Sequence, residues 1–313
     1  MSKNNNFKKL LAECMLCPHM CRVDRAAGQK GFCRAGNTAI ISSSMAHHGE
    51  EPPLSGKYGS GTIFFSHCNM KCVYCQNYQI SQEHTGNTFS AIQIASEMLN
   101  LQGQGCHNIN LVSPTIWIPQ IAEAFFIAKE SGLKIPVVYN TGGYERKQVI
   151  KLLEGIIDIY MPDIRYSSDN MAQKYSGVKN YVKNNRQSLI EMYRQVGGLV
   201  FDGNGIAKKG LLIRLLVLPG NIGGVKETLD FIKDELSPDV YLSIMAQYHP
   251  EYMAFNYPEL SRSILPGEYF QVVEYAEKLG LVNGWIQDYT PPEKDFFRPD
   301  FNREKVFKYY EDK

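Results

Sequence analysis

Short apolar segments alternate with longer amphipathic segments along most of the 313-residue chain. The short segments are rich in Ile, Val, Leu and aromatic residues, as strands are, and the longer ones carry apolar residues at helical spacing. Continuous apolar strands separated by helices predict a parallel sheet covered on its outer face. We therefore predict an α/β fold, a partial (β/α)6 TIM-like barrel. The predicted strands cover residues 61–66, 108–113, 135–141, 156–166, 210–220 and 239–250, and the predicted helices cover residues 1–12, 91–105, 118–132, 145–155, 167–176, 178–197, 226–237 and 267–280.

The composition of the flanking segments suggests three domains. Residues 1–50 form a cysteine-rich, metal-binding N-terminal module with a connector, residues 51–290 form the barrel, and residues 291–313 form a polar C-terminal tail. Ser, Pro and Gly are frequent in residues 37–60, which predicts a connecting segment that wraps onto the next domain. We expect His47 and His48, which lie in this segment, to be solvated loop histidines.

Three cysteines directly follow the first predicted barrel strand. Cys68, Cys72 and Cys75 are spaced i, i+4 and i+7. Thiolates at such spacing bind soft metals or iron–sulfur clusters, and three protein ligands leave one iron of a 4Fe-4S cluster open. The alternatives are a structural zinc site that lacks a fourth ligand, or cysteines buried in a core.

A second set of cysteines lies near the N-terminus. Cys14, Cys17, Cys21 and Cys33 are enough to close a tetrahedral zinc site or to hold a complete iron–sulfur cluster. His19 is an alternative ligand, although a histidine beside such a site more commonly forms a hydrogen bond. Residues 13–36 contain few large apolar residues, so a segment of this kind needs a cross-link such as a bound metal ion to become ordered.

Composition excludes several classes of protein. The net charge is +1, without the polybasic surface of nucleic-acid-binding proteins. No apolar run reaches the roughly 18–20 residues of a membrane span. The N-terminal residues lack the apolar region of a secretory signal, and the eight cysteines are clustered. We therefore expect metal chemistry in a reducing cytoplasm in place of disulfides.

Polar residues collect at the predicted carboxyl ends of the strands, where parallel barrels hold their chemistry. Any one of them could simply cap a strand, but together with the cysteine loop they favour a binding site. Arg165 and Arg214 can bind a carboxylate, and Tyr74 offers a ring face for stacking. The set at the strand ends is Ser113, Thr115, Asn140, Asp163, Arg165, Arg214 and Gln247.

Residues 61–290 resemble radical S-adenosylmethionine (SAM) proteins related to the pyruvate formate-lyase activating enzyme, especially the subgroup with a cysteine-rich N-terminus. The matching stretches are CMLCPHMC…GQKGFC, CNMKCVYCQN, NLVSPT, YNTGGYE, DIYMPDIRY and IRLLVLPGN. The resemblance implies a 4Fe-4S cluster on Cys68, Cys72 and Cys75, with SAM bound to the open iron.

The resemblance also suggests roles for the strand-end residues. A D-x-K segment and an arginine that contact SAM in glycyl-radical activases map onto Asp163, Arg165 and Arg214, with arginine in place of lysine at Arg165. Gln247 stands where activases have a histidine, and Val112-Ser113-Pro114-Thr115 replaces their Gly-Gly-Glu segment. The SAM carboxylate is expected at Arg214, with Arg165 and Asp163 shaping the same pocket. Ser113, Thr115, Asn140 and Asp163 are expected to contact the ribose, and Tyr74 the adenine.

The expected function is reductive cleavage of SAM to a 5′-deoxyadenosyl radical, which abstracts hydrogen from a protein glycine or a small molecule. Activation of a glycyl-radical enzyme is one form of this reaction. A low-potential donor, flavodoxin or ferredoxin, is the implied partner. Two alternatives are a radical modifier of RNA or of another protein, and a non-enzymatic iron–sulfur or zinc protein that transfers electrons.

Overall fold

A computed structural model describes residues 3–289, 298–303 and 305–307 of the chain. Its centre is a ten-stranded sheet with the order β10-β9-β8-β6-β5-β4-β2-β1-β3, and β7 pairs with β8 beside this path. The predicted tail at residues 291–313 falls largely outside the described residues. The strands are β1 (Ala39–His47), β2 (Ser60–Phe65), β3 (Asn87–Phe89), β4 (Ile109–Val112), β5 (Val137–Thr141), β6 (Ile159–Pro162), β7 (Val200–Phe201), β8 (Ala207–Leu216), β9 (Tyr241–Met245) and β10 (Gly284–Ile286).

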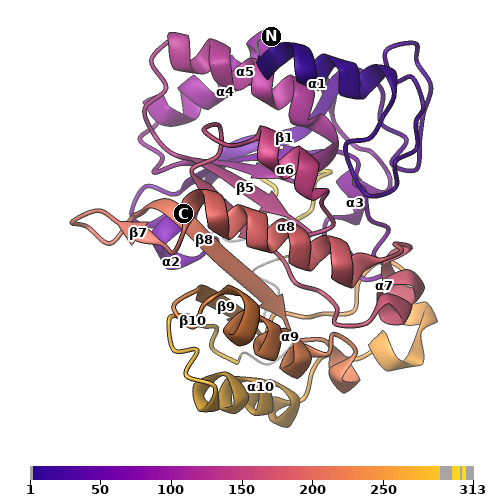
Figure 1. Ribbon diagram of the computed structural model, residues 1–313, viewed down its shortest axis with the longest axis vertical. Coiled ribbons are helices and arrows are strands. Elements are labelled where there is room, and N and C mark those ends of the chain that lie inside the picture. The colour runs from indigo at the N-terminus through magenta and orange to yellow at the C-terminus, as the bar shows by residue number, and fades with distance from the viewer. Residues whose placement is uncertain (1–2, 290–297, 304, 308–313) are drawn as a thin grey trace.

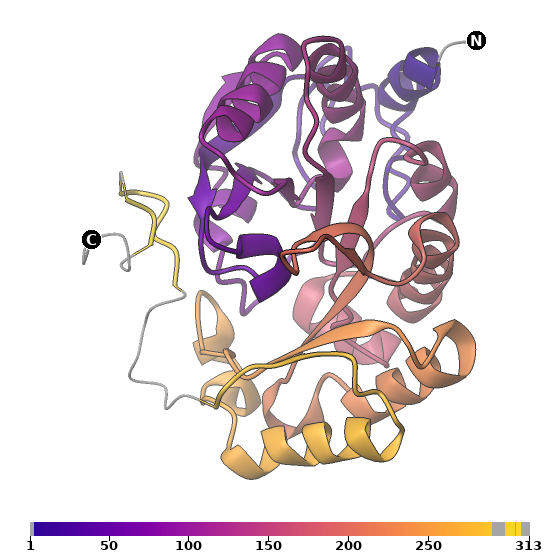
Figure 2. The ribbon, with the colours of Figure 1, turned by 90° about the vertical axis from the view of Figure 1, so that its left-hand side faces the viewer.

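From β2 to β10 every neighbouring pair in the main path of the sheet is parallel. These strands also follow one another in chain order, so each helical connection advances the sheet by one strand. The sheet curves but does not close, since β10 and β3 remain at its two edges (Figure 1 and Figure 2). The prediction of an α/β partial barrel is confirmed.

Helices cover the outer face of the curved sheet. In Figure 1, α1, α4 and α5 lie at one end, α6 and α8 cover the middle, and α9 and α10 lie against β9 and β10 at the other end. The helices are α1 (Lys3–Ala12), α2 (Pro52–Ser55), α3 (Tyr78–Ser81), α4 (Ala91–Gly103), α5 (Ile118–Glu130), α6 (Lys147–Leu152), α7 (Asp169–Ser176), α8 (Tyr181–Val196), α9 (Val225–Phe231) and α10 (Pro266–Lys278). Shorter helical turns are η1 (Thr115–Trp117), η2 (Pro219–Asn221), η3 (Ile232–Leu236), η4 (Ala254–Asn256) and η5 (Pro258–Leu260).

Local sequence explains where α4 begins and which of its faces is buried. The hydroxyl of Ser90 accepts a hydrogen bond from the backbone N–H of Gln93, whose side chain accepts one from the N–H of Ser90. This capping box satisfies two N–H groups that a helix start otherwise leaves without partners. Ile94, Met98 and Leu101 then place one apolar face of the helix in the core.

The expectation for residues 37–60 is wrong in part. Residues Ala39–His47 form β1, which pairs antiparallel with β2 along almost its whole length. His47 is 6% exposed and stacks on Phe307 with ring centroids 4.4 Å apart, so it is not a solvated loop histidine. Three successive serines interrupt the apolar pattern of this strand and hid it from the sequence analysis.

No helix in the described ranges has both the length and the apolar character needed to cross a membrane.

Candidate active site

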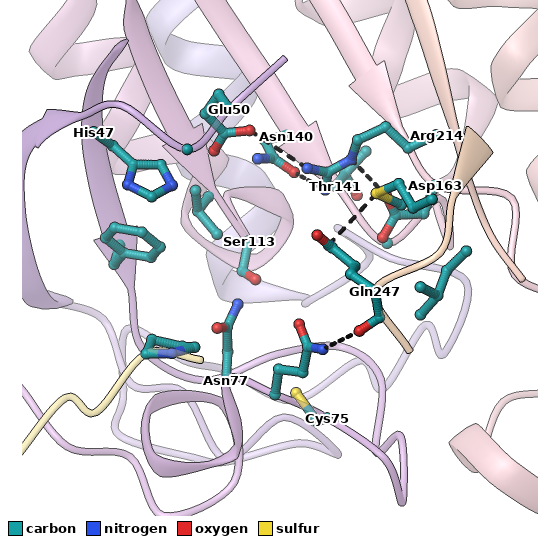
Figure 3. A pocket seen from close by; sticks show the side chains of 18 of the residues that line it. His47, Glu50, Cys75, Asn77, Ser113, Asn140, Thr141, Asp163, Arg214 and Gln247 are labelled. Carbon is teal, nitrogen blue, oxygen red and sulfur yellow. Dashed lines mark hydrogen bonds and ion pairs between the residues drawn. The ribbon is translucent and has the colours of Figure 1, made fainter. Parts of the chain in front are cut away.

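A polar pocket with a cavity volume of about 180 Å³ lies at the carboxyl ends of the parallel strands. Side chains from β4, β5, β8 and β9, from the segment after β6 and from the cysteine loop line it. Figure 3 shows Glu50, Asn140, Arg214 and Asp163 along one wall, with Cys75 and Asn77 at the opposite end. Predicted residues in the lining are Tyr74, Cys75, Ser113, Asn140, Asp163, Arg165, Arg214 and Gln247.

The cysteine loop follows β2 and is tied to the end of α7. Backbone N–H groups of Lys71 and Val73 donate to the carbonyls of Ser176 and Tyr175 at 2.9 Å. Burial and the nearby Cys72 thiol raise the pKa of Cys68 to about 12 and that of Cys75 to about 11. Because charged thiolates repel one another in this way only at short range, Cys72 lies near both Cys68 and Cys75.

A chain of hydroxyl groups ends on one of these thiols. The hydroxyl of Tyr74 is 2.6 Å from that of Tyr166, which is 2.7 Å from the hydroxyl of Ser176. Ser176 in turn donates to the sulfur of Cys72 at 3.0 Å. The hydroxyl of Tyr74 is therefore already bonded within the protein, and only its ring is available to a ligand. Its own burial raises the pKa of Tyr74, so this hydroxyl stays protonated.

Arg214 is surrounded by protein partners. Its Nε is 2.9 Å from Oδ1 of Asp163, its Nη2 donates to Oδ1 of Asn140 at 2.7 Å, and its Nη1 is 3.5 Å from Oε2 of Glu50. Burial opposes its charge, but Asp163, Glu51 and Glu50 outweigh this effect and raise the pKa of Arg214. Burial also raises the pKa of Glu50, although Arg214 and Asn110 act in the other direction.

Arg165 has a hydrogen-bond donor that no described residue uses. Its Nη2 is 2.5 Å from Oδ2 of Asp163, whereas its Nε is buried and has no hydrogen-bond partner among the described residues. Burial works against its charge, but Asp163, Cys72 and Tyr74 raise the pKa of Arg165, which places it beside the cysteine loop. A buried donor without a partner costs roughly 1–3 kcal/mol, so this geometry fits an anionic ligand that completes it.

Of the other predicted residues, Ser113 and Gln247 lie in the pocket wall, and Thr115 does not. Ser113 has a left-handed backbone (φ 58°), a conformation that glycine adopts more readily. The carbonyl of Gln247 accepts a hydrogen bond from the side chain of Gln76 at 3.1 Å. Thr115 is outside the pocket lining, and its hydroxyl donates to Oε1 of the buried Glu145 at 2.5 Å.

Several residues that the sequence analysis did not select also line the pocket, namely His47, Glu50, Gln76, Asn77, Thr141 and Gly142. Glu50 and His47 lie in the pocket wall because β1 pairs with β2, and no pattern in the sequence predicted this pairing. Gly142 and Gly143 did carry a signal, since paired glycines after a strand indicate close backbone contacts. A Cβ at Gly142 would lie 2.9 Å from Sδ of Met70, and one at Gly143 would lie 2.2 Å from the carbonyl of Asp163.

The N-terminal cysteines also gather together. Burial raises the pKa of Cys17, and the thiols of Cys33, Cys14 and Cys21 add to the effect. In the described part of the chain, however, no three His, Cys, Asp or Glu side chains are arranged to hold a metal ion as they stand. This applies equally to the N-terminal cysteines and to the three of the loop after β2.

The fold and these motifs agree with comparisons to known proteins. The chain is 31% identical over 283 residues to an uncharacterised protein of Methanocaldococcus jannaschii, a match that covers 88% of this chain and 77% of the relative. A second uncharacterised protein of that organism is 23% identical over 294 residues, covering 87% and 78%. The crystal structure of Streptococcus suis SuiB bound to precursor peptide SuiA has a similar fold, with a TM-score of 0.50 and 14% identity over 71% of this chain and 47% of SuiB.

A family model also matches more than half of the chain. It describes the radical SAM superfamily and matches residues 62–232, which include the cysteine loop and the strands from β4 to β8. The chain therefore belongs to the radical SAM superfamily, whose enzymes use a 4Fe-4S cluster, SAM and an electron donor.

Proposed function

We propose that Cys68, Cys72 and Cys75 hold the 4Fe-4S cluster and that the adjoining pocket binds SAM for hydrogen abstraction from a substrate. The observation that carries this proposal is Arg165, a partly buried cation beside the cysteine loop whose buried Nε is a donor that no described residue uses. When bound, the cluster supplies an electron for cleavage of SAM, and SAM supplies the 5′-deoxyadenosyl radical.

The two arginines have different tasks in this proposal. Arg165 binds the carboxylate of SAM through charge-assisted hydrogen bonds. Arg214 acts as a positioning residue, because its guanidinium is already bonded to Asp163, Asn140 and Glu50. Asp163 joins the two, since its Oδ1 accepts from Arg214 and its Oδ2 from Arg165.

Other pocket residues orient the rest of SAM. The hydroxyl of Ser113 and the amide of Asn140 are suited to the ribose, and the ring of Tyr74 offers an apolar face to the adenine. Thr115 is not part of this proposal, because its hydroxyl is bonded to Glu145. The protein contributes mainly by holding the reacting carbon against the target C–H bond and by excluding water.

The lining of the pocket favours a small polar substrate. Pro299 and Phe307, from the described part of the C-terminal segment, stand in the wall beside Gln76 and Asn77. Phe301 packs on Phe64 with ring centroids 5.2 Å apart, so this segment is anchored next to the pocket. A protein glycine, which the resemblance to glycyl-radical activases also allows, is the alternative substrate.

Anaerobic reconstitution tests the proposal. The chain reconstituted with iron and sulfide and reduced with dithionite should convert SAM to methionine and 5′-deoxyadenosine. Cys75→Ala should abolish this conversion, whereas Cys106→Ala, which removes a buried cysteine outside both cysteine sets, should leave it unchanged. An iron–sulfur protein that never cleaves SAM would instead be an electron-transfer protein.

The substrate class is tested with the same assay. A metabolite fraction of a cell extract should increase 5′-deoxyadenosine formation, and the protein fraction should not. An increase caused only by the protein fraction would favour the activase reaction.

A further inference from the structure

Four cysteines outside the pocket converge in the segment between α1 and β1. Cys14, Cys17 and Cys33 are each at most 9% exposed, and Cys21 is half-buried. No helix or strand holds residues 13–38. Few large apolar side chains are present there to explain why such an irregular segment should be ordered.

The backbone of this segment is shaped around the cysteines. The N–H of Cys14 donates to the carbonyl of Val23 at 2.9 Å, and the N–H of Phe32 donates to the sulfur of Cys21 at 3.4 Å. A Cβ at Gly31 would lie only 2.8 Å from that sulfur, so a larger residue would displace it. Hydrogen bonds from backbone N–H groups stabilise a thiolate better than a thiol, because they favour the charged form.

The backbone brings the four cysteines near one another. The N–H of Arg22 donates to the carbonyl of Cys14 at 3.0 Å, which places Cys21 beside Cys14, and a turn in which the N–H of Met20 donates to the carbonyl of Cys17 at 3.0 Å joins Cys17 to Cys21. The contact of the Phe32 N–H with the sulfur of Cys21 brings the neighbouring Cys33 to the same place. The segment therefore concentrates four potential thiolates in one buried region, where their charges would repel each other unless a cation bound them.

A buried arginine next to the cysteines lacks a counter-ion. Arg25 is 1% exposed, and its guanidinium donates only to the carbonyls of Gly36 and Ile116, at 2.6–2.9 Å. It also lies over the ring of Trp117 at 5.1 Å. No carboxylate in the described residues is within ion-pair distance of it. Because a buried charge without a partner is costly, this cation indicates a negative charge that the metal-free chain does not show.

We propose that Cys14, Cys17, Cys21 and Cys33 bind a second metal centre, closed by four thiolates, and that Arg25 balances its negative charge. The centre is a zinc ion or an iron–sulfur cluster, both of which accept four cysteines. Four thiolates around Zn²⁺ give a net charge of about −2, of which the single positive charge of Arg25 offsets half. With every position occupied by protein, the centre has no site for SAM.

The thiols must turn inward when the metal binds. As they stand they do not form a metal site, but neither do Cys68, Cys72 and Cys75 of the radical SAM motif. Metal binding is coupled to deprotonation of the cysteines and to their ordering. In the metal-free chain we therefore expect the thiols to point away from the positions that they occupy around the metal.

The second centre lies against the cysteine loop of the pocket. His19 Nε2 is 2.9 Å from the carbonyl of Asn69, and His67 Nδ1 is 2.9 Å from the carbonyl of Cys33. The ring of His19 stacks on Phe32 with ring centroids 3.7 Å apart. The residues on either side of Cys68 are thus bonded to the proposed metal-binding segment, which would hold that loop in place.

The test uses the full chain with Cys68, Cys72 and Cys75 all replaced by Ala, so that the centre can be measured alone. After anaerobic reconstitution with zinc, or with iron and sulfide, this variant should bind about one zinc, or about four iron and four sulfide, per chain. X-ray absorption should show sulfur ligands only, at about 2.3 Å. Zinc and iron arms of the experiment distinguish the two kinds of centre.

A folded variant that binds no metal, as judged by circular dichroism and metal analysis, would overturn the proposal. So would metal that persists after Cys17 and Cys21 are also replaced. In the otherwise native chain, Cys17→Ser with Cys21→Ser should lose only the second centre, and Cys106→Ala should lose neither. These outcomes do not depend on SAM cleavage, so they separate this inference from the proposed function.

Arg25→Met tests the charge balance without touching a ligand. Methionine keeps much of the buried volume and removes the charge. Transfer of the metal to a chelator should become roughly tenfold or more favourable, as expected when a charge-assisted interaction is lost. Unchanged metal affinity in this variant would remove Arg25 from the site.

Discussion

The roles of Arg165 and Arg214 can be separated by giving both the same substitution. Arg165→Met and Arg214→Met each remove a guanidinium from the pocket and keep an apolar side chain of similar length. The two arginines share Asp163 but differ in their remaining partners, since Arg165 has an unused Nε and Arg214 has Asn140 and Glu50. We therefore expect opposite results for ligand affinity and for stability.

Loss of Arg165 should mainly weaken SAM binding. A charge-assisted hydrogen bond contributes about 1.5–3 kcal/mol, so each lost bond should raise the dissociation constant of SAM roughly 10- to 150-fold. Asp163 keeps its contact with Arg214 at 2.9 Å, so unfolding free energy should fall by only about 1 kcal/mol.

Loss of Arg214 should mainly destabilise the protein. Glu50 would be left in the pocket wall without a cation, although it keeps the hydrogen bond from the amide of Asn110 at 2.9 Å. Breaking a buried ion pair on one side costs about 3–5 kcal/mol. SAM affinity in the remaining folded protein should decrease less than in Arg165→Met, because Arg165 is still held by Asp163.

Two measurements on each variant decide between the roles. SAM is titrated onto reconstituted, reduced protein and followed by the electron paramagnetic resonance spectrum of the cluster. Stability is measured by urea unfolding of the metal-free chain. Normal SAM affinity in Arg165→Met, combined with lost affinity and normal stability in Arg214→Met, would show that the assignment is reversed.

Three further predictions concern the cysteine loop and a buried acid. Cys72→Ala should abolish both the brown cluster colour and 5′-deoxyadenosine formation, and any SAM cleavage that survives would contradict the ligand assignment. Ser176→Ala removes the 3.0 Å hydrogen bond to Cys72, which stabilises the more negative, reduced cluster. The midpoint potential should therefore fall by about 20–60 mV in a redox titration, and an unchanged value would count against this bond. Burial raises the pKa of Glu145 from 4.5 to about 7, so the folded state holds a proton that the unfolded chain has lost. The stability from this proton is complete below pH 4.5 and is lost as the pH rises through 7, by about 2–3 kcal/mol between pH 5 and 8. Glu145→Gln should flatten that part of the stability profile in urea unfolding, and an unaltered slope would mean that another group causes it.

The strand and helix order was predictable because parallel strands are buried on both faces. Residues 135–141 and 156–166 were expected to be strands, and β5 (Val137–Thr141) and β6 (Ile159–Pro162) lie within those ranges. Such strands show as uninterrupted apolar runs, which chain length and flanking glycines separate from helices. The three serines of β1 follow another rule, because β3 pairs only with Ala39, Ile40 and Ile41 of this strand and leaves the serines on a locally open edge, where polar residues are common.

The contents of the pocket were harder to predict than its position. Strand ends indicated where Ser113, Asn140 and Asp163 would lie, since the carboxyl ends of parallel strands share one edge of the sheet. They could not indicate that Thr115 would turn away to Glu145, because the direction of a side chain after a strand depends on the turn that follows. Glu50 was missed because it reaches the pocket through the antiparallel pairing of β1 with β2.

Asp163 gives a reason for the presence of the partly buried Arg214, to which our proposal assigns no direct contact with SAM. A buried ion pair is seldom more stable than apolar residues of similar volume, so stability alone does not account for Arg214. The backbone of Asp163 pairs with that of Arg214 as an isolated bridge, and its side chain accepts from both arginines. Arg214 on β8 therefore holds the carboxylate of Asp163 in place, and this carboxylate in turn fixes the guanidinium of Arg165. A cation fixed in this way loses little freedom when it binds a carboxylate, which is the advantage that offsets the cost of burying these charges.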